Sequence, residues 1–435
     1  MSARIAVSLI GQRRYWPMLV AQSLGAFNDN FFRYALVTIV TFQSVSLFGL
    51  DSELLVPIAA SAFTLPIFLF SAIAGRIADK FDRSKMMRFA KFAEIWLMVI
   101  AAAGFILREP LLLIITLFFM GVQSAFFAPA KNSALPTLLG PHELVPGNAM
   151  ISGLLNISVL VGIGFGTVII TREFGPEIVG GGLVFMAVLG WLAIRQLPPA
   201  PASNPDMPLT LNFVWEIVRV LRSTLGHPDV LRPLLGAAWF WMLAASVVTL
   251  IPNFARSVLG TDETAVLLFS ALFTIGAATG AILCGALSGK GDALPFTVAG
   301  LVLFNVDIAL ITWNNPPLLA GADLVPGMEF VQDPANRRLL IDLVLAAVSA
   351  GLFVVPLQAM AQRRAPADLR GRLLSAGGLL NAATATLGQF TLAALALLGL
   401  PLQSAFVYLA AISLIVAIVA FFRMLKLRGT SPSPS

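Results

Sequence analysis

Charged and polar side chains inside the first apolar stretch, residues 15–48, are the residues of this chain best placed to do chemistry. Asp29 lies near the middle of that stretch, and Arg33 follows one helical turn later on the same face, which also carries Gln22 and Ala26. A carboxylate at bilayer depth costs roughly 2.5–3.5 kcal/mol on insertion scales, so it is seldom kept there without a task. The polar stripe therefore predicts a cavity wall rather than a surface facing lipid.

Three roles are open to Asp29 on this evidence. It can attract a substrate cation, carry a proton, or pair with Arg33 in a structural ion pair that lowers the cost of burying both charges. Each role needs a carboxylate inside the membrane, and the sequence of this helix does not decide among them.

The composition is that of a membrane protein. Of 435 residues, 58% are hydrophobic and 11% are charged, and the mean hydropathy is +0.89. A typical soluble domain has about 45–50% apolar residues and about 25% charged residues. The single cysteine, Cys284, excludes an internal disulfide framework, and His142 and His227 fall in polar connections. We expect no cofactor, no metal and no enzymatic activity, because neither a nucleophile–base set nor an acyltransferase motif is present in a polar loop.

Apolar runs between charged or proline-rich breaks predict twelve membrane-spanning helices. Each run is long enough to cross about 30 Å of hydrocarbon at 1.5 Å per residue. The predicted spans are residues 15–48, 54–78, 87–107, 110–130, 147–171, 179–197, 232–258, 264–288, 294–313, 339–361, 373–398 and 402–423.

Lysine and arginine give the orientation. With both termini in the cytoplasm, 22 basic residues fall on the cytoplasmic side and five on the other, with Arg33 inside the membrane. This asymmetry favours cytoplasmic termini. Because the basic residues flank apolar spans, the net charge of +6 indicates topology and contact with anionic membrane lipids rather than nucleic acid.

The spans divide six and six around a polar, proline-rich break. We predict an N-terminal bundle at 1–197, a cytoplasmic linker at 198–231, a C-terminal bundle at 232–428 and a disordered tail at 429–435. Within the linker, residues 209–225 have the spacing of an amphipathic helix on the membrane surface, with plain linker as the alternative.

The two halves repeat a short motif. Gly-Arg-Ile-Ala-Asp-Lys at 75–80 follows the second span, and Gly-Ala-Leu-Ser-Gly-Lys at 285–290 follows the eighth, 210 residues later. Two parallel six-span repeats are the pattern of a transporter with a central site between its halves. The sequence therefore favours transport.

Residues 75–85, Gly-Arg-Ile-Ala-Asp-Lys-Phe-Asp-Arg-Ser-Lys, resemble the loop between spans 2 and 3 of the major facilitator superfamily. The resemblance implies an all-α membrane fold of twelve helices in two six-helix pseudo-repeats. It also implies a cytoplasmic gate in which Gly75 lets two helices approach, Asp79 faces a helix N-terminus and Arg83 pairs with a carboxylate. Asp82 stands where the family usually has glycine. A plain positive-inside loop is the alternative.

A narrower resemblance covers nearly the whole chain. Phe-Asn-Asp-Asn-Phe-Phe at 27–32, Phe-Phe-Ala-Pro-Ala-Lys-Asn-Ser-Ala-Leu-Pro at 126–136 and Val-Pro-Leu-Gln at 355–358 resemble the lysophospholipid transporter family. The resemblance is strongest to transporter modules fused to an acyltransferase and an acyl-carrier-protein ligase (acyl-ACP synthetase). It implies inward movement of lysophosphatidylethanolamine across the bacterial inner membrane for reacylation, and a possible acyltransferase or acyl-ACP synthetase as partner.

The substrate-site prediction follows from mapping spans 1, 4, 7 and 10, which line the cavity in this superfamily. Asp29 would attract the ammonium of the headgroup, and Lys131 or Arg33 would hold its phosphate. The apolar second half would take the acyl chain. The predicted substrate-binding residues are Asp29, Asn30, Arg33, Lys131, Trp239, Trp241 and Gln358, and the predicted gating residues are Gly75, Asp79, Arg83, Glu94 and Arg372.

Other interpretations remain open at this stage. Lys131 can simply end span 4 on the cytoplasmic side, and Trp239 and Trp241 can be interface anchors. A proton-coupled exporter of drugs or metabolites, with Asp29 as the proton carrier, is the first functional alternative. A membrane scaffold that presents lysolipid to an acyltransferase is the second.

Overall fold

The computed structural model describes residues 8–43, 47, 49–140, 142–208, 212–288, 298–303, 305–307, 310, 324–366 and 370–428. The chain divides into two compact units, Met1–Arg222 and Ser223–Ser435, called unit 1 and unit 2 below. The division falls inside the predicted linker, 198–231. The predicted tail, 429–435, lies outside the described residues.

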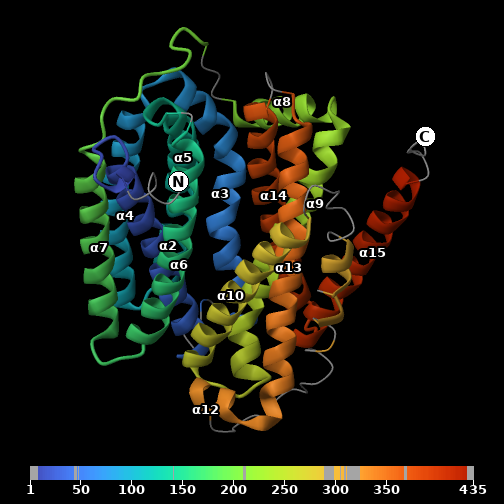
Figure 1. Cartoon of the computed structure of the whole chain (residues 1–435). Helices are drawn as coiled ribbons and strands as arrows, with labels where there is room; N and C mark the ends of the chain where they lie inside the picture. The colour runs from blue at the N-terminus through green and yellow to red at the C-terminus, as the bar shows by residue number, and fades with distance from the viewer. Residues whose placement is uncertain are drawn as a thin grey trace. The chain divides into compact units, whose positions relative to one another are not determined.

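Unit 1 is built from long helices that pack in pairs (Figure 1). Helix α2 packs against α6 and α7, α3 against α5, and α4 against α5 and α7. The helices of unit 1 are α2 (Trp16–Phe42), α3 (Ser52–Lys80), α4 (Arg83–Leu107), α5 (Pro110–Leu138), α6 (Leu144–Ile169) and α7 (Gly175–Ile194), followed by α8 (Phe213–Leu225) at the division.

Local sequence accounts for where these helices begin and end. Proline occupies the first turn of α2, α5 and α7, where its missing N–H has no partner to lose. Asp82 caps α4 by accepting a hydrogen bond from the Lys85 N–H at 3.0 Å. This capping role accounts for an aspartate at the position where the family loop usually has glycine. Arg108, in the left-handed region at φ 55°, ends α4.

Unit 2 repeats the pairing of unit 1. Helix α9 packs against α14 and α10 against α13, as α2 packs against α6 and α3 against α5. The helices of unit 2 are α9 (Pro228–Ser257), α10 (Glu263–Ser288), α12 (Gly327–Gln332), η1 (Pro334–Asn336), α13 (Arg337–Arg364), α14 (Arg370–Leu397) and α15 (Leu402–Arg428). The first and fifth spans of each half pair, and so do the second and fourth, which supports the predicted duplication.

Ten helices in the described ranges are long and apolar enough to cross a membrane. Helix α2 is not one of these ten, because the polar residues 28–30 and Arg33 interrupt its apolar run. The all-α membrane fold is confirmed. The number twelve stays a prediction, since most of the predicted ninth span, 294–313, lies outside the described residues.

Glycines set the closest helix contacts of each unit. On α6, a Cβ at Gly162 would lie 2.5 Å from the carbonyl oxygen of Phe27, and one at Gly166 would lie 2.5 Å from that of Phe31. On α10, Gly276 and Gly280 meet the backbone of α13 in the same way. Both helices therefore carry a Gly-x-x-x-Gly sequence that lets two backbones touch.

Helix α5 extends beyond its predicted end at residue 130. It continues to Leu138 with Pro129 and Pro136 inside it, because membrane helices tolerate proline where neighbouring groups satisfy the freed carbonyls. Lys131 therefore lies about two turns before the end of the helix. The helix itself therefore does not end at Lys131.

Candidate functional site

A cavity of about 190 Å³ lies among four helices of unit 1. Its lining combines polar and charged side chains with two aromatic rings. The lining residues are Gln22, Gly25, Ala26 and Asp29 of α2, Phe63 of α3, Lys91 and Glu94 of α4, and Gln123, Ser124, Phe127, Ala128 and Lys131 of α5. Gln22, Ala26 and Asp29 confirm the cavity wall predicted from the stripe on α2.

The charged centre of the cavity is a buried ion pair. Lys91 Nζ lies 2.6 Å from Glu94 Oε2, and these side chains are 2% and 4% exposed. The amide of Gln123 donates to the same Glu94 oxygen at 3.0 Å. A buried carboxylate needs such donors to offset its loss of hydration. Both members of the pair belong to α4, and the hydrogen bond from Gln123 ties α4 to α5.

The space for the Lys91 ammonium comes from two residues of neighbouring helices. Gly25 of α2 leaves the place that Lys91 Nζ fills, since a Cβ at that position would collide with it. The ring of Phe127 lies under the ammonium, with Nζ 5.1 Å from the ring centroid. Lys91 is therefore held by contacts from α2, α4 and α5.

Two charges of the cavity are without such partners. Within the described ranges, the Asp29 carboxylate accepts no hydrogen bond and joins no ion pair. The Lys131 ammonium likewise donates no hydrogen bond and joins no ion pair there. Lys91, Glu94 and Arg33 are the charges close enough to act on Asp29. Among the described residues, Asp29 and Lys131 thus face the cavity without a direct hydrogen-bond or ion-pair partner.

Arg33 and Asn30 are turned to each other rather than to the cavity. Arg33 Nη2 donates to Asn30 Oδ1 at 3.0 Å, and its guanidinium lies 5.1 Å from the ring centroid of Phe63. The amide of Asn30 donates to the Ala26 carbonyl. The structural ion pair between Asp29 and Arg33 is therefore absent from the described part of the chain. Of the predicted polar ligands on α2, only Asp29 reaches the cavity.

The predicted site residues of the second half lie in unit 2. Trp239 packs edge to face on Phe353, with ring centroids 5.7 Å apart, and its buried indole N–H has no partner among the described residues. Trp241, two positions later on α9, is 44% exposed, and Gln358 of α13 is exposed. Unit 2 also encloses an apolar cavity of about 30 Å³ among α9, α10, α13 and α15.

The predicted gating loop between α3 and α4 contacts the segment after α7. The Asp79 carboxylate accepts a hydrogen bond from Ser203 Oγ at 3.1 Å. Arg83 donates from its backbone N–H to the Ala200 carbonyl and from its guanidinium to the Pro201 carbonyl, each at 2.9 Å. Among the described residues, the prediction that Arg83 pairs with a carboxylate is wrong, because its guanidinium bonds a backbone carbonyl instead.

Residues 197–208, called the linker strap below, run along this loop. Donors from α3 and α4 bond the carbonyl groups of the strap. These are Arg88 to Leu197 at 2.5 Å, Ser84 to Pro198 at 2.5 Å, Arg83 to Pro201 at 2.9 Å, Lys80 to Met207 at 2.9 Å, and Arg76 to Pro208. Arg76 also pairs at 2.5 Å with Glu216 of α8, which is 3% exposed. The strap and the start of α8 are therefore fixed to unit 1.

The remaining gating predictions have mixed outcomes. A Cβ at Gly75 would meet nothing within 4 Å, so the close helix approach predicted there is wrong. The approach of α3 to α5 occurs at Gly121 instead, where a Cβ would collide with the Phe63 carbonyl. Glu94 lies in the cavity wall and bonds Lys91 and Gln123. The side chain of Arg372 and the loop residues 289–290 lie outside the described residues.

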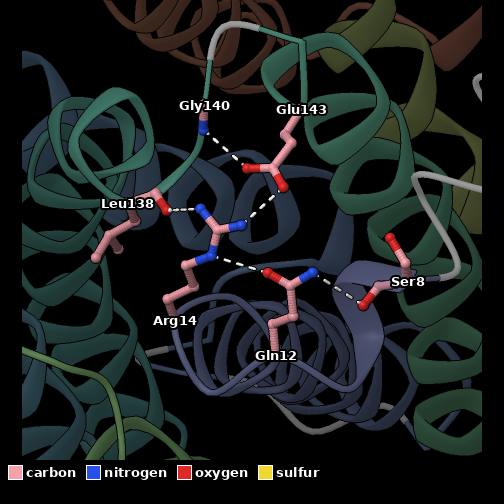
Figure 2. A network of polar contacts seen from close by, with 6 residues as sticks. All are labelled: Ser8, Gln12, Arg14, Leu138, Gly140 and Glu143. Carbon is pink, nitrogen blue, oxygen red and sulfur yellow. Dashed lines mark hydrogen bonds and ion pairs between the residues drawn. The ribbon is translucent and has the colours of Figure 1, made fainter.

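A second polar network joins the start of α2 to the connection between α5 and α6 (Figure 2). Arg14 donates to the Leu138 carbonyl at 2.9 Å and pairs with Glu143 at 2.7 Å. The other Glu143 oxygen accepts from the Gly140 N–H at 2.8 Å. The hydrogen bond from the Gly140 N–H lowers the pKa of the Glu143 carboxyl below its usual 4.5, and Arg14 lowers this pKa further.

This network predicts an acid-sensitive contribution to stability. Because the pKa of Glu143 is lower in the folded state, its stabilisation is fully present above pH 4.5 and is lost as the pH falls through the folded value. Melting temperatures of the parent and Glu143→Gln should therefore differ at neutral pH and converge below pH 4.5. A difference that does not change with pH would contradict the ionised contact.

Sequence reasoning missed Lys91 and Gln123 as cavity residues. The signal was present, because Lys91 and Glu94 are three residues apart inside a predicted span and so share a helix face. An intramembrane pair of opposite charge implies a polar interior. Gln123 gave no such signal, since an uncharged amide in an apolar span has many structural uses.

Comparison with known proteins places this architecture among transporters. Residues 18–331 match the family model described as "Major Facilitator Superfamily". The lysophospholipid transporter LplT of Escherichia coli O1:K1 / APEC is 24% identical over 355 residues, which cover 80% of this chain and 79% of that protein. The same identity and coverage hold for the LplT protein of Shigella boydii serotype 4 (strain Sb227).

Solved structures show the same fold at low sequence identity. A D-xylose-proton symporter aligns with a TM-score of 0.68 and 12% identity over 93% of this chain and 97% of its own. A bacterial homologue of the human lysosomal transporter Spinster, in an inward-facing and unoccupied conformation, aligns with a TM-score of 0.63 and 15% identity over 98% and 100%. At these identities the likeness concerns the fold alone.

Proposed function

Because this chain belongs to the major facilitator superfamily, we propose that it is a lysophospholipid transporter that works by alternating access. Its substrate is lysophosphatidylethanolamine and related lysolipids, moved from the outer to the inner leaflet of the bacterial inner membrane. The relatives named lysophospholipid transporter support this substrate class. The repeated helix pairing of the two units supports a mechanism in which two similar halves move.

The observation that carries the proposal is that Asp29 and Lys131 face one cavity of unit 1 without a hydrogen-bond or ion-pair partner among the described residues. A lysophosphatidylethanolamine headgroup has one phosphate anion and one ammonium cation. Lys131 would bind the phosphate and Asp29 the ammonium, each through a charge-assisted hydrogen bond. The cavity of about 190 Å³ would hold a headgroup and not a whole lipid.

We propose Trp239, Trp241 and Gln358 of unit 2 as further substrate-binding residues. Trp239 and Trp241 of α9 present aromatic surface, and Gln358 of α13 is an exposed polar group of the same unit. Asp79 and Arg83, which hold the linker strap, and Arg372 belong to the gate.

The cellular setting is proposed from the charge pattern of the chain. Both termini would lie in the cytoplasm, as the distribution of basic residues favours. Lysolipid delivered to the inner leaflet is a substrate for reacylation. An acyltransferase with an acyl-ACP synthetase is therefore the partner we propose.

Uptake into sealed vesicles tests the proposed function. Purified protein in proteoliposomes should move labelled lysophosphatidylethanolamine between leaflets without ATP and without any acyltransferase, at a rate well above that of protein-free vesicles. Movement without the enzyme would exclude the scaffold alternative. Binding of lysolipid should also raise the melting temperature more than soluble drugs or sugars do. The opposite ranking would favour the exporter alternative.

A further inference from the structure

The two ammonium groups of the unit 1 cavity are in different electrostatic situations. Lys91 lies 2.6 Å from Glu94, and both side chains are almost fully buried. Lys131 has no ion-pair partner within the described residues. In a poorly hydrated site, two opposite charges at short distance attract each other strongly, and their effects on a third charge farther away largely cancel. Lys91 therefore offers little attraction to a bound anion as long as Glu94 is ionised.

The position of the pair is fixed from three sides. Gln123 donates to Glu94, Gly25 leaves the space for the Lys91 ammonium, and Phe127 lies 5.1 Å below it. These contacts hold Lys91 toward α2 and Glu94. Lys91 nevertheless lines the same cavity as Lys131. It is therefore a second cation of the cavity, and it is paired with Glu94.

The charge balance of the cavity follows from this arrangement. Among the residues that the structure describes, Asp29 and Glu94 are its acids, and Lys91 and Lys131 are its bases. Once Lys91 and Glu94 neutralise each other, Asp29 and Lys131 remain. A ligand with one anion and one cation compensates both, whereas a ligand with a single anion leaves the Asp29 charge unmatched.

We propose that Glu94 is a specificity-determining residue: by engaging Lys91 it leaves Lys131 as the one unpaired cation among the described residues of the cavity, and so favours zwitterionic over net anionic lysolipid headgroups. This inference rests on the proposed function. Without the Glu94 charge, Lys91 becomes a second donor to phosphate, and the preference moves toward anionic headgroups.

The test measures a ratio rather than a rate. Full-length protein in proteoliposomes takes up labelled lysophosphatidylglycerol and lysophosphatidylethanolamine in parallel, at equal concentration and ionic strength. Glu94→Gln is expected to raise the uptake ratio of the anionic to the zwitterionic lipid about ten-fold. An unchanged ratio would overturn the proposal.

A matched control separates this local effect from the general field of the protein. Glu177, an exposed residue in the first turn of α7, belongs to the same unit but not to the cavity. Glu177→Gln makes the same change in net charge, and its ratio should equal that of the parent. An equal shift in both variants would assign the effect to net charge and refute a specific role for Glu94.

A double variant covers the case in which Glu94→Gln does not fold. Lys91→Met combined with Glu94→Gln removes both charges of the pair, which is less disruptive than leaving one buried and unpaired. Its uptake ratio should return to the parental value. A ratio below that value would show that Lys91 already binds the phosphate, and the proposal would fail. A parent protein that moves no lysolipid at all would refute the proposed function instead.

Discussion

Asp29→Asn is expected to lower uptake of lysophosphatidylethanolamine by roughly ten- to a hundred-fold in proteoliposomes. The substitution keeps the shape of the side chain and removes the free anion of the cavity. A hydrogen bond to a charged group contributes about 1.5–3 kcal/mol, which corresponds to this range of rates if it is lost in the transport cycle. Uptake of lysophosphatidylglycerol, which has no ammonium, should fall much less.

The control for this variant is Asp229→Asn. Asp229 lies in the first turn of α9, and its side chain is 76% exposed, so the same chemical change there should leave uptake unchanged. If Asp29→Asn keeps both the rate and the headgroup preference of the parent, Asp29 is structural. If net uptake is lost while exchange of lipid between leaflets persists, Asp29 is a proton carrier and the exporter alternative gains support.

Gly166→Val is expected to lower the melting temperature by roughly 6–12 °C. The new side chain would meet the Phe31 carbonyl at 2.5 Å and the Ala35 nitrogen at 2.9 Å, and these backbone atoms of α2 cannot rotate away. Overpacking of this kind costs about 3 kcal/mol at the upper end of its usual range, and a domain of this size loses about 2–4 °C per kcal/mol. Because α2 carries Asp29, lysolipid binding should weaken in parallel.

Gly153→Val is the matched control on the same helix. A Cβ at Gly153 meets nothing within 4 Å, so this variant should melt close to the parent. Thermal unfolding of both variants in detergent, followed by loss of monodisperse protein, measures the difference. Equal melting temperatures for the two variants would mean that the contact between α6 and α2 does not limit stability.

Much of the fold could be predicted because apolar length and charge placement are local properties of the sequence. Most predicted spans correspond to observed helices, and the division between the units, after Arg222, falls inside the predicted linker 198–231. The predicted ends of the helices were less accurate. Helix α5 passes the charge of Lys131 and Pro136, since a helix can continue where its neighbours satisfy the affected groups.

The candidate site was predictable only in part. Asp29 stood out because a lone carboxylate in an apolar run is costly, and it does face the cavity. Whether Arg33 pairs with Asp29 or Asn30 depends on side-chain rotamers and on Phe63 of another helix, which spacing along α2 does not contain. Nor does local sequence reveal that Gly25 makes room for Lys91, because that contact joins two helices.

The linker strap is recognised through its main chain. Side chains of α3 and α4 bond its carbonyl groups, and every residue type supplies a carbonyl. Leu197 and Ala200 are buried, and Ser203 bonds Asp79 through its hydroxyl, so these three side chains are constrained. The other side chains of the strap are free to diverge during evolution, provided that its prolines, which pre-set the backbone, are kept or replaced by equivalents. Apart from Leu197, Ala200 and Ser203, amino-acid identity along residues 197–208 should consequently drift faster among descendants of this protein than identity at Lys80, Arg83, Ser84 and Arg88.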